Sequence, residues 1–296
     1  MRLIAIGEIL WDVFPDDERI GGAPFNLAVQ ARRLGHDVAF ISAVGRDLRG
    51  DAALRAVQAR GLDSRWISRH SRLPTGIVAV QLASGEPRYE IVQPAAYQEP
   101  ELSPASWAAL ADVPPDFICF GTLAQAAPAV RRLTRHLCQA FPQARGFYDI
   151  NLRPGFEDPR LVCELLAGTQ ILKCNAEEAS RLPGLLELPL TAPVWDDAAP
   201  ARMRAQAAAY AAALRSVLAL ELVSITLGAC GCALATADTS AAAPAAAGEI
   251  SNPVGAGDAF SAGLLHAWHQ GWKLSEVARC AGQTAVEQCG IDGRSR

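Results

Sequence analysis

A glycine-rich turn followed by one carboxylate is the stretch of this sequence whose spacing best suits chemistry. In residues 252–268, NPVGAGDAFSAGLLHAW, the small residues Gly255, Ala256 and Gly257 precede Asp258 and an apolar run with helical spacing. Backbone amides at a helix start lack intrahelical acceptors, and together with the helix dipole they attract an anion such as phosphate. A carboxylate repels phosphate, so Asp258 suits this place as a base that takes a proton from an attacking hydroxyl. The stretch therefore predicts phosphoryl transfer.

The same stretch also has a purely structural interpretation, in which Asp258 caps the helix and the glycines only let the turn close. Two other phosphate-binding motifs do not fit. The chain contains no G-x-x-x-x-G-K-[ST], which excludes a P-loop. A lone G-x-G so late in the chain, without a following strand that ends in an acidic residue, is a weak sign of a dinucleotide site.

Strand-like and helix-like segments alternate along the chain, which predicts an α/β fold with a doubly wound, mostly parallel sheet flanked by helices. Segments with apolar residues at helical spacing end at Gly35 and at Gly61, as is typical of C′ glycines. The predicted strands are rich in Val, Ile, Leu and Phe, and they are residues 3–10, 37–45, 116–123, 144–150, 169–175 and 222–228.

One region breaks the alternation. Residues 75–92, TGIVAVQLASGEPRYEIV, read as two antiparallel strands joined by the turn SGEP. We therefore predict a single domain over residues 1–296, with a small β lid formed by about 11–22 and 75–97. The apolar face of the lid needs a cover, which is substrate, the main domain or a second copy of the chain, so a homodimer through the lid is one expectation.

Composition narrows the classes of function. The chain has 296 residues, half of them hydrophobic, and a formal net charge of -4. It lacks the basic field expected of a nucleic-acid partner, and no apolar run reaches the ~20 residues that span a bilayer. The apolar start is interrupted by Glu8 and lacks a cleavage site, so we expect a cytoplasmic protein without membrane contact. Eight scattered cysteines without C-x-x-C give no sign of zinc or redox chemistry.

Two motifs near the ends of the chain occur together. GGAPFNLA (21–28) and VGAGDAFSAG (254–263) resemble the paired signatures of the ribokinase-like (pfkB-type) carbohydrate kinases. GEILWD, PTG, DINLRP, KCNAEEA and TLGACG also match in the expected order, so the resemblance covers nearly the whole chain. Among subgroups, GEILWD, GGAPFN and DINLRP are most similar to bacterial fructokinases.

The resemblance implies an ATP-dependent sugar kinase that transfers the γ-phosphate of MgATP to a primary hydroxyl, with fructose as the expected sugar. A 2-keto-3-deoxygluconate kinase and a ribokinase are alternatives within the class. A non-catalytic sugar or nucleotide sensor with the same fold is the alternative from a different class. A nicotinamide-dependent oxidoreductase is a more distant one.

The resemblance also implies roles for individual residues. Asp258 is then the catalytic base, and the amides of Gly255, Ala256 and Gly257 form the anion hole. Glu178 is expected to meet Mg²⁺ through water. The expected sugar ligands are Asp12, Gly21, Gly22 and Asn26, with Arg153 near the sugar or the moving phosphoryl group, and the expected ATP ligands are Asn175, Thr226, Gly228, Gly231, Gly255 and Gly257.

Position in the predicted fold supports some of these roles and leaves structural alternatives. Asp12 is expected to end the first strand, where open α/β sheets gather ligands, and Asn26 to lie in the turn before a helix. The alternatives are a surface aspartate and a helix-capping asparagine. Arg153 is equally suited to a structural salt bridge, and TLGACG to a tight turn. N-x-x-E at Asn175 and Glu178 is also a capping pattern.

The chain departs from the family pattern before the glycine turn. The family usually has an acidic residue where this chain has Asn252, followed here by Pro253. That acidic residue helps many members bind a monovalent cation. Asn252 removes its charge and Pro253 removes a backbone donor, and both changes put K⁺ activation in doubt.

Overall fold

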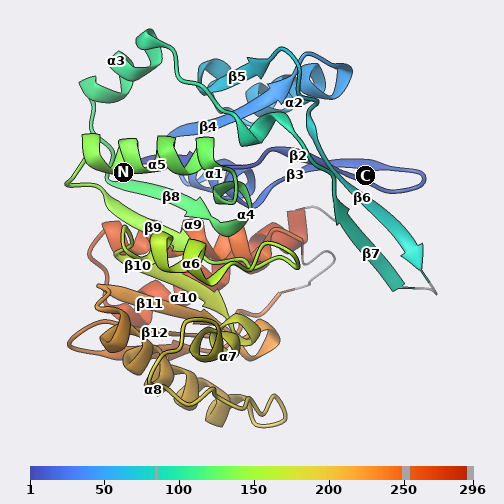
Figure 1. Cartoon of the computed structure of the whole chain (residues 1–296). Helices are drawn as coiled ribbons and strands as arrows, with labels where there is room; N and C mark the ends of the chain where they lie inside the picture. Colours follow the sequence, from blue (N-terminus) through green and yellow to red (C-terminus); the bar gives the residue numbers. More distant parts are fainter. Residues whose placement is uncertain (84–85, 249–253, 292–296) are drawn as a thin grey trace. The chain divides into compact units, whose positions relative to one another are not determined.

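A computed structural model describes residues 1–83, 86–248 and 254–291, in two compact units. The N-terminal unit comprises residues 2–144, and the C-terminal unit comprises Met1 and residues 145–296. Both units have parallel strands flanked by helices, as predicted for an α/β protein (Figure 1).

The N-terminal unit is built on four parallel strands in the order β8-β1-β4-β5. Residues Leu3 to Ile6 are fully buried, and burial of each large apolar side chain contributes ~1.5–3 kcal/mol. The strands are β1 (Arg2–Ile6), β4 (Asp37–Gly45), β5 (Ile67–His70) and β8 (Phe117–Gly121), and the helical segments are α1 (Ala23–Arg33), α2 (Leu48–Ala59), η1 (Ser64–Trp66), η2 (Ala96–Gln98), α3 (Pro104–Asp112), α4 (Thr122–Gln125) and α5 (Pro128–Ala140).

A second, smaller sheet of the N-terminal unit has the order β3-β2-β6-β7. Its hairpin β6–β7 is antiparallel, as predicted, and projects as a long ribbon (Figure 1). The strand β2 pairs with both β3 and β6. The bounds are β2 (Leu10–Val13), β3 (Glu18–Gly21), β6 (Gly76–Ala83) and β7 (Glu86–Ile91).

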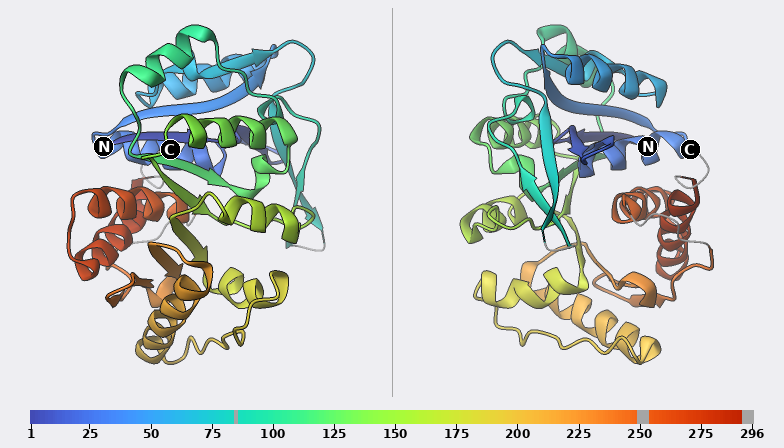
Figure 2. Two further views of the ribbon diagram at one scale, coloured as in Figure 1. Left: turned by 60° about the vertical axis from the view of Figure 1, so that its left-hand side comes forward. Right: turned by 90° about the vertical axis from the view of Figure 1, so that its right-hand side faces the viewer.

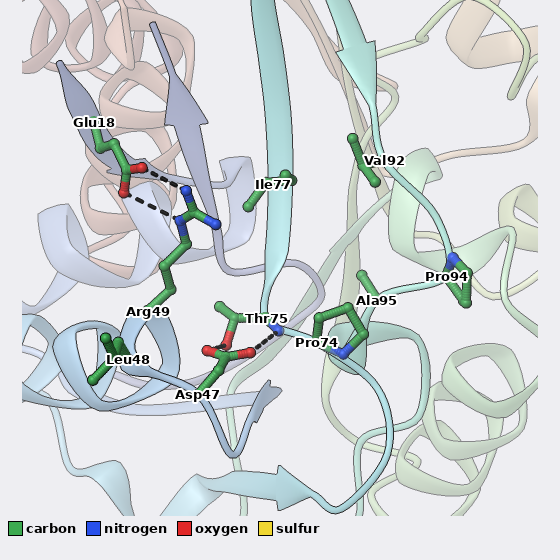
Figure 3. A pocket seen from close by; sticks show the side chains of 10 residues that line it. All are labelled: Glu18, Asp47, Leu48, Arg49, Pro74, Thr75, Ile77, Val92, Pro94 and Ala95. Carbon is green, nitrogen blue, oxygen red and sulfur yellow. Dashed lines mark hydrogen bonds and ion pairs between the residues drawn. The ribbon is translucent and has the colours of Figure 1, made fainter. Parts of the chain in front are cut away.

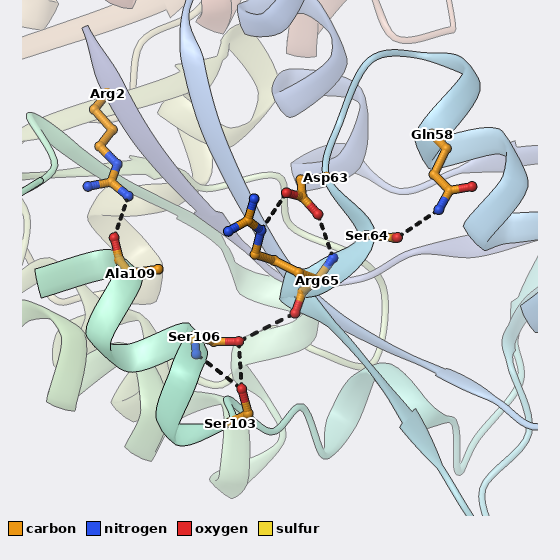
Figure 4. A network of polar contacts seen from close by, with 8 residues as sticks. All are labelled: Arg2, Gln58, Asp63, Ser64, Arg65, Ser103, Ser106 and Ala109. Atoms are coloured by element: carbon orange, nitrogen blue, oxygen red, sulfur yellow. Dashed lines mark hydrogen bonds and ion pairs between the residues drawn. The ribbon is translucent and has the colours of Figure 1, made fainter. Parts of the chain in front are cut away.

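Polar contacts fasten α3 to the rest of the N-terminal unit (Figure 4). Ser103 caps the helix by accepting a hydrogen bond from the amide of Ser106 at 3.1 Å. The Arg2 guanidinium donates to the carbonyl of Ala109 at 2.9 Å. The Ser106 hydroxyl donates to the carbonyl of Arg65, so α3 is tied to both β1 and η1.

The C-terminal unit carries five strands in the order β13-β12-β11-β10-β9. The pairs β9–β10 and β10–β11 are parallel, whereas β11–β12 and β12–β13 are antiparallel. Helices α7 and α8 lie on one face, and the paired helices α9 and α10 lie on the other (Figures 1 and 2). The bounds are β9 (Arg145–Asp149), α6 (Pro159–Leu166), β10 (Ile171–Asn175), α7 (Ala176–Leu185), α8 (Pro200–Leu218), β11 (Leu222–Thr226), η3 (Gly228–Cys230), β12 (Cys232–Ala235), β13 (Ser240–Ala243), α9 (Ala256–His269) and α10 (Leu274–Ile291).

Three details differ from the sequence predictions. Residues 3–10 are not one strand, because β1 ends at Ile6 and Leu10 begins β2 in the other sheet, so Asp12 does not end the first strand of the parallel sheet. Asn26 lies inside the first turn of α1, which begins at Ala23, and not in a turn before the helix. Strands β5 and β12 were not predicted. Among the helices of the described part, none has the length and apolarity to cross a bilayer.

Candidate active site

The glycine turn forms the start of α9. Gly255 is its N-cap, with the left-handed conformation φ 78°, and Ala256, Gly257 and Asp258 are the first three helical residues. Since the amide of Ala259 donates to the carbonyl of Gly255 at 2.9 Å, the amides before it have no acceptor within the helix. Asp258 belongs to the first turn, where its charge meets the positive end of the helix dipole. The geometry needed for an anion hole with an adjacent carboxylate is thus present within one unit.

A buried ion pair lies beside this turn. Lys173 of β10 donates from Nζ to both carboxylate oxygens of Asp149, the last residue of β9, at 3.0 Å each. The two residues face one another across the parallel strands. The Ser261 hydroxyl, one turn into α9, lies 2.9 Å from Asp149 Oδ2 and 3.0 Å from the carbonyl of Gly257. These contacts bring α9 to the carboxyl ends of β9 and β10, where ligands of α/β proteins gather.

Electrostatics keep Lys173 charged. Burial alone would lower the pKa of its ammonium, but the charges of Asp149, Glu178 and Asp258 raise the pKa above its usual value. Burial raises the pKa of the Glu178 carboxyl, in part offset by the charge of Lys173. The edge of the sheet therefore holds one buried cation among several carboxylates.

Glu178 joins two segments of the site. Its Oε2 accepts from the amide of Asn175 at 2.8 Å, and Asn175 Oδ1 accepts from the amide of Glu178 at 2.9 Å, which is a complete capping box on α7. Its Oε1 accepts from the amide of Leu152 at 2.9 Å and so holds the DINLRP loop. The capping interpretation is confirmed, and the interpretation as a metal residue stays a prediction.

The residues present fit a magnesium ion held mainly by phosphates and water. Within the described residues, no three His, Cys, Asp or Glu side chains come together as a metal-binding group. Glu178 is only 5% exposed, and each of its oxygens keeps a lone pair beyond the one that accepts a backbone amide. Mg²⁺ retains most of its waters in such sites, so a contact through water suits this carboxylate.

The motif TLGACG connects β11 and β12. Thr226 ends β11, and the amide of Leu227 donates to the carbonyl of Gly231 at 2.8 Å across the turn. This confirms the tight turn, whereas the nucleotide role of Thr226, Gly228 and Gly231 stays a prediction. A Cβ on Gly231, where φ is 105°, would lie 2.1 Å from the carbonyl oxygen of Ala243.

Gly231→Ala should therefore destabilise the protein by about 3 kcal/mol, because left-handed backbone strain adds to a clash with main-chain atoms. Gly228→Ala is the matched control, since φ is 56° there and a Cβ would meet nothing within 4 Å. It should cost only ~1–2 kcal/mol. Urea unfolding of both variants measures the difference, and equal costs would contradict the clash.

Arg153 is exposed in the loop after β9, and its carbonyl accepts from the amide of Phe156 at 2.9 Å. No ion pair of Arg153 is found among the residues that the structure describes, so the structural salt bridge has no support there. Asn252 and Pro253, on which the expectation about K⁺ rests, lie outside the described residues.

The predicted sugar residues form a group within the N-terminal unit. Asp12 Oδ2 lies 3.0 Å from the point where a Cβ on Gly21 would sit, so the two residues share one face of the small sheet. Gly22 is the N-cap of α1, and its carbonyl accepts from the amide of Asn26 at 2.9 Å. The predicted catalytic and ATP residues all belong to the C-terminal unit.

Sequence reasoning did not single out Asp149, Lys173 or Ser261. One signal was present, because Lys173 interrupts the otherwise apolar strand ILKC, and a lysine inside a buried strand requires a partner. The identity of that partner was not visible from local spacing.

The chain thus combines an α/β fold with a helix start whose first amides have no acceptor within the helix and with an adjacent carboxylate. The model of the pfkB family carbohydrate kinases matches residues 13–293. This chain belongs to the pfkB family of carbohydrate kinases and is therefore a phosphotransferase enzyme.

The chain is similar, at low sequence identity, to proteins that are named as kinases. The chain is 28% identical to aminoimidazole riboside kinase of Salmonella typhimurium over 284 residues, covering 89% of this chain and 80% of the relative. It is also 28% identical to a fructokinase of Klebsiella pneumoniae over 284 residues, covering 89% and 83%. A solved structure of an uncharacterized sugar kinase from Pyrococcus horikoshii matches with a TM-score of 0.76 and 25% identity, over 98% of this chain and 92% of the other.

Proposed function

We propose that this enzyme transfers the γ-phosphate of MgATP to a primary hydroxyl of a sugar, with fructose as the substrate. One observation carries the proposal. The first turn of α9 presents helix-start amides and the Asp258 carboxylate together, directly beside the buried Lys173. An attacking hydroxyl and a transferring phosphoryl group need this pair of functions.

In this proposal Asp258 orients the sugar hydroxyl and accepts its proton late in the reaction. The amides of Gly255, Ala256 and Gly257 hold the oxygens of the phosphoryl group, where each donor is worth ~2.7–4 kcal/mol. Arg153 is free to reach the sugar or this group from its exposed loop.

The nucleotide is proposed to meet Asn175, Thr226, Gly228 and Gly231. The Pyrococcus horikoshii sugar kinase has also been solved in complex with ATP, which supports ATP as the donor. When bound with the nucleotide, Mg²⁺ supplies neutralising charge to the phosphates, and Glu178 is the residue proposed to contact its waters. Use of ATP also favours a cytoplasmic location.

The proposal of fructose rests on the motifs GEILWD, GGAPFN and DINLRP and on the fructokinases among the relatives. Asp12 and Asn26 offer a carboxylate and an amide, which distinguish hydroxyl patterns because an unmatched buried polar group costs ~1–3 kcal/mol. Gly21 and Gly22 give the sugar access to the main chain beside them.

A panel of sugars with MgATP, followed by ADP release, tests the proposal. The panel holds fructose, ribose, 2-keto-3-deoxygluconate and aminoimidazole riboside, and fructose should give the highest kcat/KM. Preference for another member would assign a different substrate within the class. Turnover of none of them would count against sugar phosphorylation.

We further propose that the small sheet acts as a lid and that it joins two copies of the chain. Trp11, Ile20 and Ile77 share one face by strand register. Beside this face is a cavity of about 550 Å³ with an apolar wall (Figure 3). The Glu18–Arg49 ion pair lies on one side of the cavity and Val92 and Pro94 on the other, with Leu48, 85% exposed, at its edge.

Leu48→Asp should therefore convert a dimer into a monomer in light scattering at micromolar concentration, because it places a charge in an apolar contact. Val194→Asp is the control, since Val194 is 83% exposed and belongs to the C-terminal unit. It should leave the mass unchanged. A monomeric wild-type protein would remove the proposed dimer.

A further inference from the structure

Lys173 is an unusual residue of this chain by both type and place. Only two of the 27 basic residues are lysines, and Lys173 is the one in a strand. Among the described residues it is also the sole buried Lys or Arg, 7% exposed. Arginine supplies the other 25 basic side chains apart from Lys273, and its planar guanidinium is larger than the compact ammonium of lysine.

The contacts of Lys173 show where this difference in size matters. Its Nζ lies between Asp149, which accepts two hydrogen bonds of 3.0 Å, and the start of α9. On the α9 side, Nζ is only 3.2 Å from the point where a Cβ on Gly257 would sit. A larger cationic group would push this turn away, and a side chain at position 257 would press on the ammonium. Lysine and glycine therefore fit one another across the turn.

A second interaction connects the Asp149 carboxylate to the first turn of α9. The Ser261 hydroxyl lies within hydrogen-bond distance of Asp149 Oδ2 and of the Gly257 carbonyl, and it donates to one of them at a time. Asp149 thus holds α9 through Ser261 and holds Lys173 beneath its first turn. The Asp149 carboxylate therefore contacts both Lys173 and, through Ser261, the first turn of α9.

Stability alone does not account for this arrangement. A buried ion pair is often no more stabilising than well-packed apolar residues of the same volume. The charge has an electrostatic role instead, because the ammonium lies among Asp149, Glu178 and Asp258, each of which raises its pKa. Removal of the ammonium would leave the carboxylates to repel both one another and an incoming phosphate.

We propose that Lys173 is a positioning residue for phosphoryl transfer, whose ammonium fixes the turn formed by residues 255–258 and balances the charge of Asp258 beneath the bound phosphoryl group. The inference rests on the proposed function only in that phosphate binds at this turn. It does not depend on which sugar is the acceptor.

The test compares binding of ADP alone with binding of ADP and aluminium fluoride in magnesium buffer, by calorimetry and without any sugar. Aluminium fluoride mimics the transferring phosphoryl group, so the wild type should bind the mixture at least tenfold more tightly than ADP. Lys173→Met should lose this tightening and bind ADP within twofold of the wild type. Lys273→Met, which removes the other, exposed lysine, should behave as the wild type.

A second variant guards against misfolding, since Lys173→Met leaves the Asp149 carboxylate buried without its cation. Lys173→Met combined with Asp149→Asn removes both charges, and it should also lose the tightening while retaining cooperative thermal unfolding. Full tightening in either variant would overturn the proposal. No tightening in the wild type would overturn it as well, because the turn would then not bind a phosphoryl group.

Lysine NMR gives an independent readout in the unaltered protein. With ¹⁵N-lysine the wild type contains only two Nζ groups, and Lys273→Met assigns them. The Lys173 signal should move when aluminium fluoride joins ADP, and the Lys273 signal should not. A stationary Lys173 signal would contradict the inference. If these results hold and no sugar is phosphorylated, the proposed acceptor is wrong and the role of Lys173 stands.

Discussion

Asp258→Asn should lower kcat by at least ~10²-fold and leave ATP binding nearly unchanged. Asparagine keeps the shape of the side chain but does not accept a proton from the sugar hydroxyl, and loss of a general base costs 10²–10⁴-fold. The amides of the α9 turn are main-chain groups, so the substitution should leave their proposed contact with the phosphate unchanged. Steady-state kinetics with the best sugar of the panel, together with calorimetry of ATP, measure the two effects separately.

Glu276→Gln is a matched control for Asp258→Asn. Glu276 is likewise an acidic residue at the third position of a helix, α10, and its carboxylate accepts from the amide of Lys273 at 3.0 Å. Both substitutions remove one favourable charge from a helix start, worth ~0.3–1 kcal/mol. Glu276→Gln should therefore lose about as much stability as Asp258→Asn and leave kcat unchanged. Equal activity of wild type and Asp258→Asn would instead favour a sensor without catalysis.

The parts of the fold that sequence alone predicts are those in which local pattern and tertiary position agree. Residues 37–45 form β4 as predicted, because a strand of a parallel sheet is covered on both faces and reads as a continuous apolar run. The N-x-x-E pattern likewise predicts the capping box of Asn175 and Glu178, since each partner lies within one helical turn of the other.

Prediction fails where the chain changes sheets without a change of pattern. Residues 3–10 are almost continuously apolar, yet β1 ends at Ile6 and the next strand pairs with β6, far away in sequence. Hydrophobicity reports that a residue is buried and not which sheet buries it. The predicted position of Asp12, at the end of the first strand, was wrong for this reason.

The ion pair of Lys173 and Asp149 could not be predicted from the sequence, for a related reason. Its partners are 24 residues apart and meet only because β9 and β10 are parallel neighbours in a register that the sequence does not specify. The turn before α9 was visible from its residues, whereas the support beneath it was a property of the tertiary structure alone.

Glu178→Gln should destabilise the protein by roughly 2 kcal/mol, the cost of leaving a buried backbone amide without an acceptor. Both carboxylate oxygens of Glu178 accept from amides, those of Leu152 and Asn175. A glutamine offers one oxygen, and its amide group turns a donor toward the remaining N–H. The midpoint of thermal unfolding should fall by on the order of 4–8 °C.

The pH dependence of stability should change as well. Burial raises the pKa of the Glu178 carboxyl in the folded protein above its value in the unfolded chain. Between these two values the folded state binds more protons, so the contribution of Glu178 to stability falls as the pH rises through the interval. Glutamine does not titrate, and the variant should lack this part of the dependence.

Glu177→Gln is the matched control, because Glu177 adjoins Glu178 in the same helical turn but is exposed, 4.0 Å from Arg181. An exposed pair of this kind contributes ~0–1 kcal/mol, so this variant should unfold close to the wild type at every pH. Glu178 also holds the loop that carries Arg153, so Glu178→Gln should lower kcat/KM where Glu177→Gln does not. Indistinguishable stability of the two variants would mean that the two amides find other acceptors, and the bridge between the loop and α7 would lose its support.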